Sequence, residues 1–251
     1  MRPHHSLVHS RTRLTPRYAL FPLEGYPFSR LPTWPDAQVR VLASPAIGAG
    51  FVQYLIDLPA GKRGEFAADG RAETFFYVLK GKGTLTSSAE KNRPLTPGSF
   101  GLLPPDRGLA ITAKSAMQIL VHRQIFKPVA GIDVFKPLLS HESEVKSVAW
   151  ADTDKIQLQT LIPDEFQFDL AVNIFAFTPG FGLPITETHV MEHGALILQG
   201  KGVYRLGDDW TEVEKDDYLW MGPYCPQSFY ATGDVPAKYI YTKDVNREIE
   251  L

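Results

Sequence analysis

The chain has 251 residues, and its 26 Lys and Arg against 28 Asp and Glu give a formal net charge of −2. This near balance excludes the broad positive surface of a protein that binds nucleic acid or an anionic membrane. Hydrophobic residues make up 44% of the chain, too many for a disordered protein, and no apolar run approaches the roughly 20 residues that span a bilayer.

The amino-terminal region is rich in arginine and lacks the apolar stretch of a secretory signal. Residues 1–20 contain Arg2, Arg11, Arg13 and Arg17 and no acidic residue, a composition weakly like that of an organelle transit peptide. We expect residues 1–40 to form an N-terminal arm, whose prolines favour wrapping over a sheet or a neighbouring subunit. The single cysteine, Cys225, excludes an intrachain disulfide and predicts a reducing, cytoplasmic location.

Short β-branched and aromatic runs, bounded by Gly, Pro or Asp, predict strands throughout the chain, and almost no segment has a helical period. The predicted strands are Phe51–Leu58, Thr74–Lys80, Thr84–Ser87, Ser99–Leu103, Met117–Phe126, Ala171–Phe177, Ala195–Gln199, Val203–Leu206, Tyr218–Met221 and Lys238–Lys243. This pattern is typical of an all-β sandwich or barrel. We expect one barrel over residues 41–128, a linker over 129–165 and a second barrel over 166–251.

The two halves of the sequence repeat one another. An offset of 119 residues, reduced to 118 after one deletion, aligns Glu73 with Glu192, Leu79 with Leu198, Gly81-Lys82-Gly83 with Gly200-Lys201-Gly202, Phe100 with Tyr218 and Pro105 with Pro223. The repeated glycines suit tight turns between antiparallel strands, because glycine adopts a positive φ without steric cost. The sequence therefore predicts a duplicated all-β unit.

Candidate metal ligands lie only in the second half. Glu187 and His189 are two residues apart and share one face of a strand, His193 keeps the same parity, and Gln227 follows the predicted strand Tyr218–Met221. Two imidazoles, a carboxylate and an amide oxygen suit a divalent first-row metal such as Mn, Fe, Co, Ni or Zn. On an octahedral ion, four protein ligands leave positions open for substrate or water.

The internal repeat provides a control for this interpretation. The residue types alone leave open a purely structural role for the two histidines. At the corresponding positions the first half has Ala68, Gly70, Thr74 and Leu109, and none of these is a metal ligand. Because one half keeps the strands without the ligands, the ligand set is dispensable for the scaffold, which favours a functional metal site in the second half.

The spacing of these residues resembles that of a bicupin. The usual cupin motifs are G-x5-H-x-H-x3,4-E-x6-G and G-x5-P-x-G-x2-H. In the first motif, Glu187 stands at the first His position and His193 at the Glu position, while in the second Asp216, Gly222, Tyr224 and Gln227 stand at the G, P, G and H positions. The spacing is kept while the ligand types are exchanged.

That exchange, with the runs ETHVMEHGALILQGKGVY, DDYLWMGPYCPQSFYATG and YIYTKDVNREIEL, resembles the (S)-ureidoglycine aminohydrolases, a bicupin family of purine catabolism. The resemblance covers essentially the whole chain, including the ligand-free first cupin with ETFFYVLKGKG. It implies two tandem jelly-roll-type barrels, a homo-oligomer, and a Mn²⁺-dependent hydrolase of allantoin degradation. Such an enzyme converts (S)-ureidoglycine, a small polar ureido compound, to (S)-ureidoglycolate and ammonia.

The family's functional residues carry over onto matching positions. The resemblance implies Glu187, His189, His193 and Gln227 as metal ligands, and Glu187, Gln227, Tyr204, Tyr239 and Lys243 as substrate contacts. Lys243 is suited to pairing with the substrate carboxylate or to moving a proton, and Glu187 is the other candidate for proton transfer. Alternatives from the residue types are ordinary barrel lining for the tyrosines and a solvated strand end for Lys243. Asp216 departs from the usual glycine of the second motif.

Two other functions compete with this interpretation. Two histidines and one carboxylate also form the facial set of Fe(II) oxygenases, although Gln227 as a fourth ligand would use a position that dioxygen and substrate share. A bicupin that binds a small ligand without turnover is the non-enzymatic alternative. Cys225 lies near Gln227, but it has no evident base-orienting partner, so we expect it to be a buried structural residue.

Overall fold

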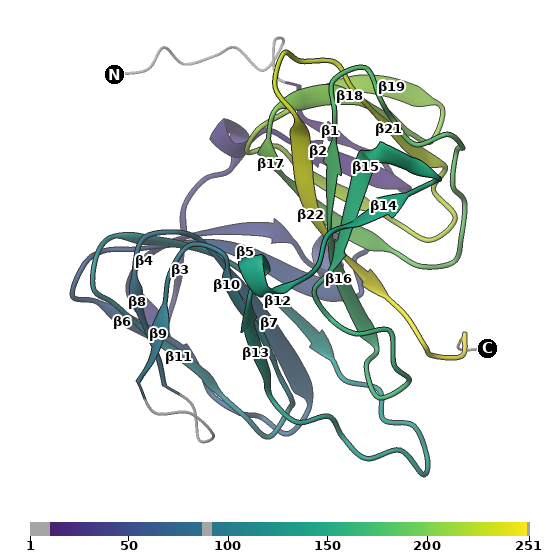
Figure 1. Cartoon of the computed structure of the whole chain (residues 1–251). Helices are drawn as coiled ribbons and strands as arrows, with labels where there is room; N and C mark the ends of the chain where they lie inside the picture. The colour runs from purple at the N-terminus through teal and green to yellow at the C-terminus, as the bar shows by residue number, and fades with distance from the viewer. Residues whose placement is uncertain (1–10, 87–91, 250–251) are drawn as a thin grey trace, which may run out of the picture. The chain divides into compact units, whose positions relative to one another are not determined.

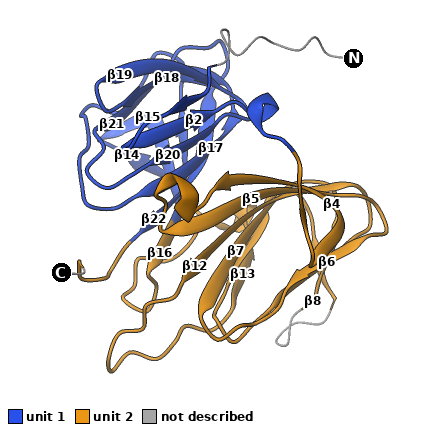
Figure 2. Ribbon diagram, turned by 180° about the vertical axis from the view of Figure 1, so that it is seen from behind, with its two compact units in different colours: residues 1–27, 147–160, 172–244 blue, residues 28–146, 161–171, 245–251 orange. Residues whose placement is uncertain are grey.

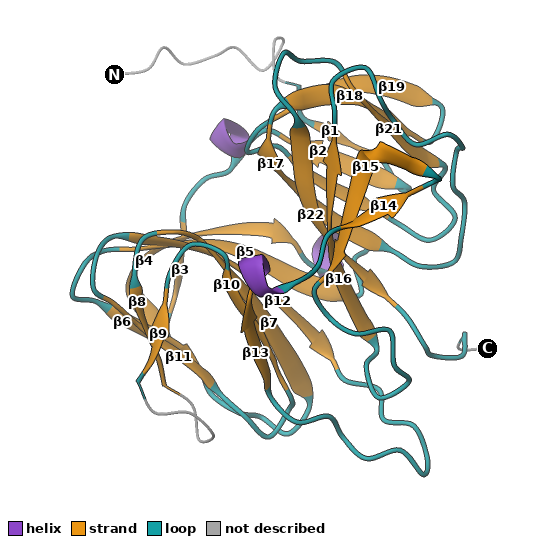
Figure 3. Ribbon diagram, viewed as in Figure 1, coloured by secondary structure: helices purple, strands orange, loops and turns teal. Residues whose placement is uncertain are grey.

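The computed structural model describes residues 11–86 and 92–249. Residues 1–10 of the predicted arm, with Arg2, and Ser87 at the end of one predicted strand lie outside the described residues. Regular structure in the described part is almost all strand, with three short 3-10 helices, η2 (Leu23–Gly25), η3 (Pro45–Ile47) and η4 (Glu142–Glu144) (Figure 3). None of the helices in this part is long and apolar enough to cross a membrane.

The chain divides into two units, which Figure 2 colours separately. We call them the N-terminal barrel, which comprises residues 28–146, 161–171 and 245–249, and the C-terminal barrel, which comprises residues 11–27, 147–160 and 172–244, as far as the chain is described. Each contains one large and one small sheet, with an apolar core of its own.

The N-terminal barrel has a seven-stranded and a four-stranded sheet. The large sheet has the order β13 (Leu138–His141), β10 (Ser99–Leu103), β7 (Ala72–Lys80), β12 (Met117–Ile125), β5 (Phe51–Leu58), β4 (Trp34–Ala43) and β3 (Ser29–Leu31). The small sheet has the order β6 (Arg63–Phe66), β11 (Leu109–Ala113), β8 (Gly83–Thr86) and β9 (Arg93–Leu95). The strand labels are marked in Figure 1.

The C-terminal barrel has an eight-stranded and a three-stranded sheet. The large sheet has the order β1 (Arg13–Leu14), β2 (Tyr18–Phe21), β20 (Tyr218–Met221), β17 (His193–Gln199), β22 (Ala237–Asp244), β16 (Leu170–Phe177), β15 (Thr153–Thr160) and β14 (Val148–Trp150). The small sheet has the order β19 (Asp209–Glu214), β18 (Lys201–Leu206) and β21 (Gln227–Ala231).

Strand order confirms the duplication that the sequence predicts. The run β10-β7-β12-β5-β4-β3 of one barrel corresponds to β20-β17-β22-β16-β15-β14 of the other. The register corresponds as well, since Leu103 lies opposite Thr74 and Met221 lies opposite His193. All ten predicted strands are present within two residues of their expected ends as far as they are described, and the all-β bicupin architecture is confirmed.

The repeated Gly-Lys-Gly turns have a distinct reason for each glycine. Gly81 and Gly200 have φ values of 81° and 72°, so the first glycine supplies a left-handed backbone. The second glycine allows close approach, because a Cβ on Gly202 would lie 2.4 Å from two ring carbons of Phe229. The corresponding Cβ on Gly83 would lie 2.5 Å from the sulfur of Met117.

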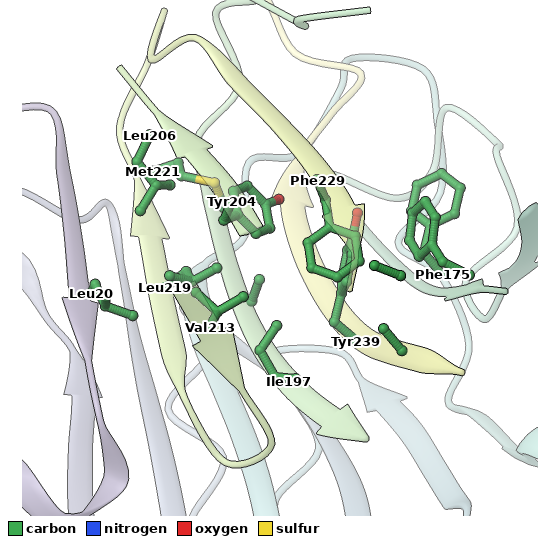
Figure 4. Packing of buried hydrophobic residues seen from close by; sticks show 14 of the residues in the cluster. Leu20, Phe175, Ile197, Tyr204, Leu206, Val213, Leu219, Met221, Phe229 and Tyr239 are labelled. Carbon is green, nitrogen blue, oxygen red and sulfur yellow. The ribbon is translucent and has the colours of Figure 1, made fainter. Parts of the chain in front are cut away.

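The core of the C-terminal barrel is rich in aromatic rings contributed by both of its sheets. Figure 4 shows Tyr204 and Phe229 from the small sheet together with Phe175 and Tyr239 from the large sheet. The rings of Phe229 and Tyr239 meet edge to face with their centroids 5.4 Å apart. Such packing fixes the spacing of the two sheets, and with it the position of polar groups carried on the same strands.

Residues 11–27 belong to the C-terminal barrel and residues 28–40 to the N-terminal barrel, whereas the sequence predicts an arm over residues 1–40. Within that range β2 pairs with β20, and its residues Tyr18 and Leu20 are buried in the apolar core. Arg11 donates two hydrogen bonds to the carboxylate of Asp217, one of them with 2.9 Å between nitrogen and oxygen. Burial of apolar side chains and this ion pair make the segment part of the barrel.

Two further predicted boundaries differ from the structure. The predicted linker 129–165 contains β13, β14 and β15, which extend the large sheets of the two barrels. Residues 166–171 and 245–249 of the predicted second barrel cluster with the N-terminal barrel instead, as do residues 161–165 of the predicted linker. There the ring of Phe168 packs against Phe135 with centroids 5.2 Å apart, and Arg247 donates to the carbonyl of Phe166.

The close approach at Gly202 predicts a loss of stability on substitution. In Gly202→Ala, the added methyl group must displace the Phe229 ring, and we expect the free energy of unfolding to fall by about 2 kcal/mol or more. Chemical denaturation followed by tryptophan fluorescence measures this change. Gly233→Ala is the matched control, because its Cβ would meet the flexible side chain of Lys201 at 3.1 Å and otherwise only make ordinary contact with the carbonyl of Val235 at 3.8 Å. An equal loss in both variants would contradict the packing explanation.

Candidate active site and metal centre

The loop that carries two of the predicted ligands is tied to the small sheet of the C-terminal barrel. Glu187 and Gln227 form an isolated antiparallel bridge, and their backbone N–H groups donate to one another's carbonyls at 2.9 and 3.0 Å. The carbonyl of His189 accepts from the N–H of Tyr224 at 2.8 Å. Hydrogen bonds to Gln227 and Tyr224 therefore hold the backbone at Glu187 and His189 in place.

Three of the four predicted ligands come together. The Nε2 atoms of His189 and Gln227 are 3.2 Å apart, and the rings of His189 and His193 have their centroids 4.8 Å apart. His193 begins β17 and Gln227 begins β21, and both side chains are buried. The Nδ1 atoms of both histidines are buried without a hydrogen-bond partner. Buried nitrogens without a partner are costly, which is consistent with a site that takes a ligand.

The strand beside β17 is β22, and it carries Lys243, Tyr241 and Tyr239. His193 lies directly opposite Lys243 in the register of β17 and β22, so their side chains share one face. Tyr241 and Tyr239 precede Lys243 by two and four residues, so alternation places them on that face as well. Tyr204 reaches the same interior from β18, and its hydroxyl interacts with that of Tyr239.

Burial controls the protonation of these groups. It holds the pKa of His193 well below its ordinary value, with the charges of His189 and Lys243 acting in the same direction. The neutral imidazole that results is the form that binds metal ions. Burial also raises the pKa of Tyr204, Tyr239 and Tyr241, and the carboxylate of Glu187 adds to each of these shifts. The three tyrosines therefore remain protonated donors at neutral pH.

Glu187 faces the same interior as the tyrosines electrostatically. Its carboxylate acts electrostatically on all three hydroxyls, and among the described residues no three His, Cys, Asp or Glu side chains are arranged to hold a metal ion. The donors nevertheless fit a divalent metal in type, because they comprise two imidazoles, an amide and a carboxylate. The buried Nδ1 atoms of the two histidines, which have no hydrogen-bond partner among the described residues, support the same assignment.

Two residues of this interior, Tyr241 and Asn173, are absent from the sequence-based prediction. The side-chain amide of Asn173, on β16, donates to the hydroxyl of Tyr241 at 3.1 Å, while its Oδ1 is buried without a partner. The ring of Tyr241 stacks on the ring of Phe175, and its centroid lies 5.7 Å from the centroid of the His193 ring. The alternation of Tyr239, Tyr241 and Lys243 is the signal that could have found Tyr241, whereas Asn173 has no local signal.

The exchanged positions of the second cupin motif are explained by the backbone. Asp216 and Tyr224 stand where the motif has glycine, and both have positive φ, at 74° and 59°. In the N-terminal barrel, the residue that corresponds to Asp216 is Gly98, which has a φ of 91°. Asp tolerates this left-handed conformation better than most residues, so the turn survives without glycine. Nearby, Cys225 is buried and its pKa is raised by burial, in keeping with a structural thiol.

At the matched positions, all of them described, the N-terminal barrel has no equivalent ligand set. Leu109 begins β11 just as Gln227 begins β21, and Thr74 occupies on β7 the register position of His193. Gly70 and Ala68 match His189 and Glu187. The structure thus confirms the alignment on which the internal control rests.

The comparisons with known structures define the class of protein. The structure resembles a cupin 2 conserved barrel domain protein from Leptotrichia buccalis, with a TM-score of 0.65, 13% identity, and 94% and 99% of the two chains covered. It resembles the crystal structure of protein Ylba from Escherichia coli more strongly, with a TM-score of 0.86, 31% identity and 98% of each chain covered. The fold and its strand order are those of a bicupin.

Sequence comparison then gives the family. The chain is 35% identical over 242 residues to the (S)-ureidoglycine aminohydrolase of Escherichia coli strain K12, covering 93% of this chain and 90% of the relative. It is 31% identical to that of Arabidopsis thaliana, covering 92% of this chain and 76% of the relative. No family model matches the chain. The chain belongs to the (S)-ureidoglycine aminohydrolase family.

The hydrogen bond between Asn173 and Tyr241 predicts a stability effect. In Tyr241→Phe the ring remains stacked on Phe175, but the buried amide of Asn173 loses its partner, so we expect about 1–3 kcal/mol of destabilisation. Tyr230→Phe is the matched control, because Tyr230 is 46% exposed and water can replace its contacts. Urea unfolding of both variants tests this prediction, and equal stabilities would refute it.

Proposed function

We propose that the chain hydrolyses (S)-ureidoglycine to (S)-ureidoglycolate and ammonia, with Mn²⁺ as its cofactor. The observation that carries the proposal is the grouping of His189, His193 and Gln227 beside Lys243 in the C-terminal barrel. The names of the relatives support the same reaction, since this chain is 35% identical to one of them over 242 residues.

The proposed metal ligands are Glu187, His189, His193 and Gln227. A divalent ion held by them would supply a positive charge that orients a small substrate and polarises its oxygen atoms. The buried, neutral His193 and the fixed backbone of the bridge between Glu187 and Gln227 support this set. Open positions beyond four protein ligands leave room for the substrate.

The surrounding side chains match the polar groups of ureidoglycine. The ammonium group of Lys243 is suited to pair with the substrate carboxylate. The protonated hydroxyls of Tyr204 and Tyr239 are suited to donate hydrogen bonds to the oxygen atoms of the substrate. The side chains of Glu187 and Gln227 are suited to contact the nitrogen atoms of the substrate. Contacts on several sides of the α-carbon would fix the hand of the substrate and hence of the product.

The reaction exchanges one bond at the α-carbon. The bond between the α-carbon and the amino nitrogen breaks, and the nitrogen keeps the electron pair. A new bond forms between the α-carbon and the oxygen of one water molecule. One proton of that water passes to the departing amine, which leaves as ammonia. Lys243 and Glu187 are the two residues proposed to carry this proton, because both side chains act on groups of the same interior.

The finer biological setting is part of the same proposal. The reaction belongs to the degradation of allantoin in purine catabolism, and we place the enzyme in the cytoplasm as a homo-oligomer. The single cysteine supports a reducing compartment. The family resemblance supports the assembly.

Loss of Glu187 provides the first test. Manganese-loaded protein should convert fresh (S)-ureidoglycine to (S)-ureidoglycolate with one equivalent of ammonia, followed by NMR above the spontaneous decay. In Glu187→Ala we expect kcat/KM to fall at least about 100-fold, together with bound manganese. Glu212→Ala removes an exposed carboxylate of β19 and should leave both unchanged. Metal-loaded wild-type protein without turnover would refute the proposal.

Lys243→Met separates binding from proton transfer. If Lys243 pairs with the carboxylate, KM rises, whereas if it moves the proton, kcat falls; in either case we expect kcat/KM to drop at least about 10-fold. Lys201→Met removes an exposed lysine of the same barrel as a control. Full turnover in Lys243→Met would remove this residue from the chemistry and leave Glu187 to carry the proton.

A further inference from the structure

The N-terminal barrel contains a pocket that the proposed reaction does not use. Its volume is about 660 Å³, within the range of sites for small molecules. Phe126 and Val134 contribute to a largely apolar lining, and Arg71, Arg107 and Lys136 bring three cationic side chains to it.

The pocket lies at the end of this barrel that corresponds to the candidate active site of the other. Gly70 and Pro105 line it, and the internal repeat aligns them with His189 and Pro223. Among the matched ligand positions, Gly70 lines the pocket where the other barrel has an imidazole. The corresponding end of this barrel thus has a pocket lined by two arginines and no imidazole.

An aromatic cluster holds the apolar side of the pocket in place. The rings of Phe126 and Phe135 meet edge to face with centroids 5.6 Å apart, and Phe135 packs in turn on Phe168 at 5.2 Å. Phe135 is 3% exposed, so this part of the wall belongs to the packed interior. A wall packed in this way supports an apolar ligand body without reorganising.

The charges at the pocket do not cancel. Asp106 is the single carboxylate among its lining residues, and it pairs with Arg107 at 3.5 Å. Its side chain is 65% exposed, so water screens its charge. Three cations against one carboxylate leave an excess of two positive charges beside apolar walls. Guanidinium groups bind carboxylates by paired hydrogen bonds, which strengthen where water is partly excluded.

We propose that this pocket binds a small organic carboxylate with an apolar body, such as an aromatic acid. The carboxylate lies toward Arg71, Arg107 and Lys136, and the apolar body lies against Phe126 and Val134. This ligand differs from ureidoglycine, which has no apolar body, so the pocket is a second site with its own specificity.

Titration of the full chain with 4-fluorobenzoate tests the proposal. Fluorine NMR of the ligand should show saturable binding with a dissociation constant below about 1 mM. In the methyl spectrum of the protein, the signals of Ile125 and Val134 should shift as the ligand binds. The neutral isostere 4-fluorobenzamide should bind at least about tenfold more weakly. The double variant Arg71→Gln/Lys136→Gln should weaken binding of the acid by a similar factor.

Arg63→Gln is the matched control, since Arg63 is an exposed arginine of β6 outside the pocket and pairs with Glu65. It should leave the affinity unchanged. The proposal is overturned if the acid does not bind, if acid and amide bind equally, or if Arg63→Gln weakens binding as much as the double variant does. Binding that shifts neither methyl signal would place the acid elsewhere and would equally overturn it.

Discussion

The register of β17 against β22 determines the candidate site. The pairing places His193 opposite Lys243 and Ile197 opposite Tyr239, so an imidazole, an ammonium group and phenol rings enter one interior. A slip of one residue would turn every one of these side chains to the other face of the sheet. The aromatic core prevents such a slip, because Tyr239 packs on Phe229 of the opposite sheet. Stability and site geometry therefore depend on the same contacts.

Burial then sets the protonation of His193 and of the three tyrosines in this interior. His193 is neutral because its imidazole is removed from water and lies near Lys243, while the tyrosines keep their protons for the same reason of desolvation. The result is an interior that combines the neutral imidazole of His193 and phenolic donors with the side chains of Lys243 and Glu187. Such a combination suits a divalent metal together with a small zwitterionic substrate, and it suits an apolar molecule poorly.

Duplication explains how the two barrels diverged without loss of the fold. Both keep the strand order, the left-handed glycines of the Gly-Lys-Gly turns and the register at Thr74 and His193. Residues at the strand ends and in the loops were free to change, because they contribute little to the core. One barrel has acquired imidazoles there, and the other has guanidinium groups beside an apolar pocket. The side-chain chemistry of the two barrels differs where packing imposes the weakest constraint.

The sequence by itself determined the strand pattern, the duplication and the candidate ligands, because alternation, turn glycines and ligand spacing are local. Strands of mixed polarity such as β15 and β19 lacked a clear apolar pattern and were missed. Only the tertiary structure decided that β2 pairs with β20 and that Asn173 meets Tyr241, since these contacts join residues far apart in the chain. It also decided that the carboxylate of Glu187 acts on the tyrosine hydroxyls, because side-chain direction follows from packing rather than from spacing.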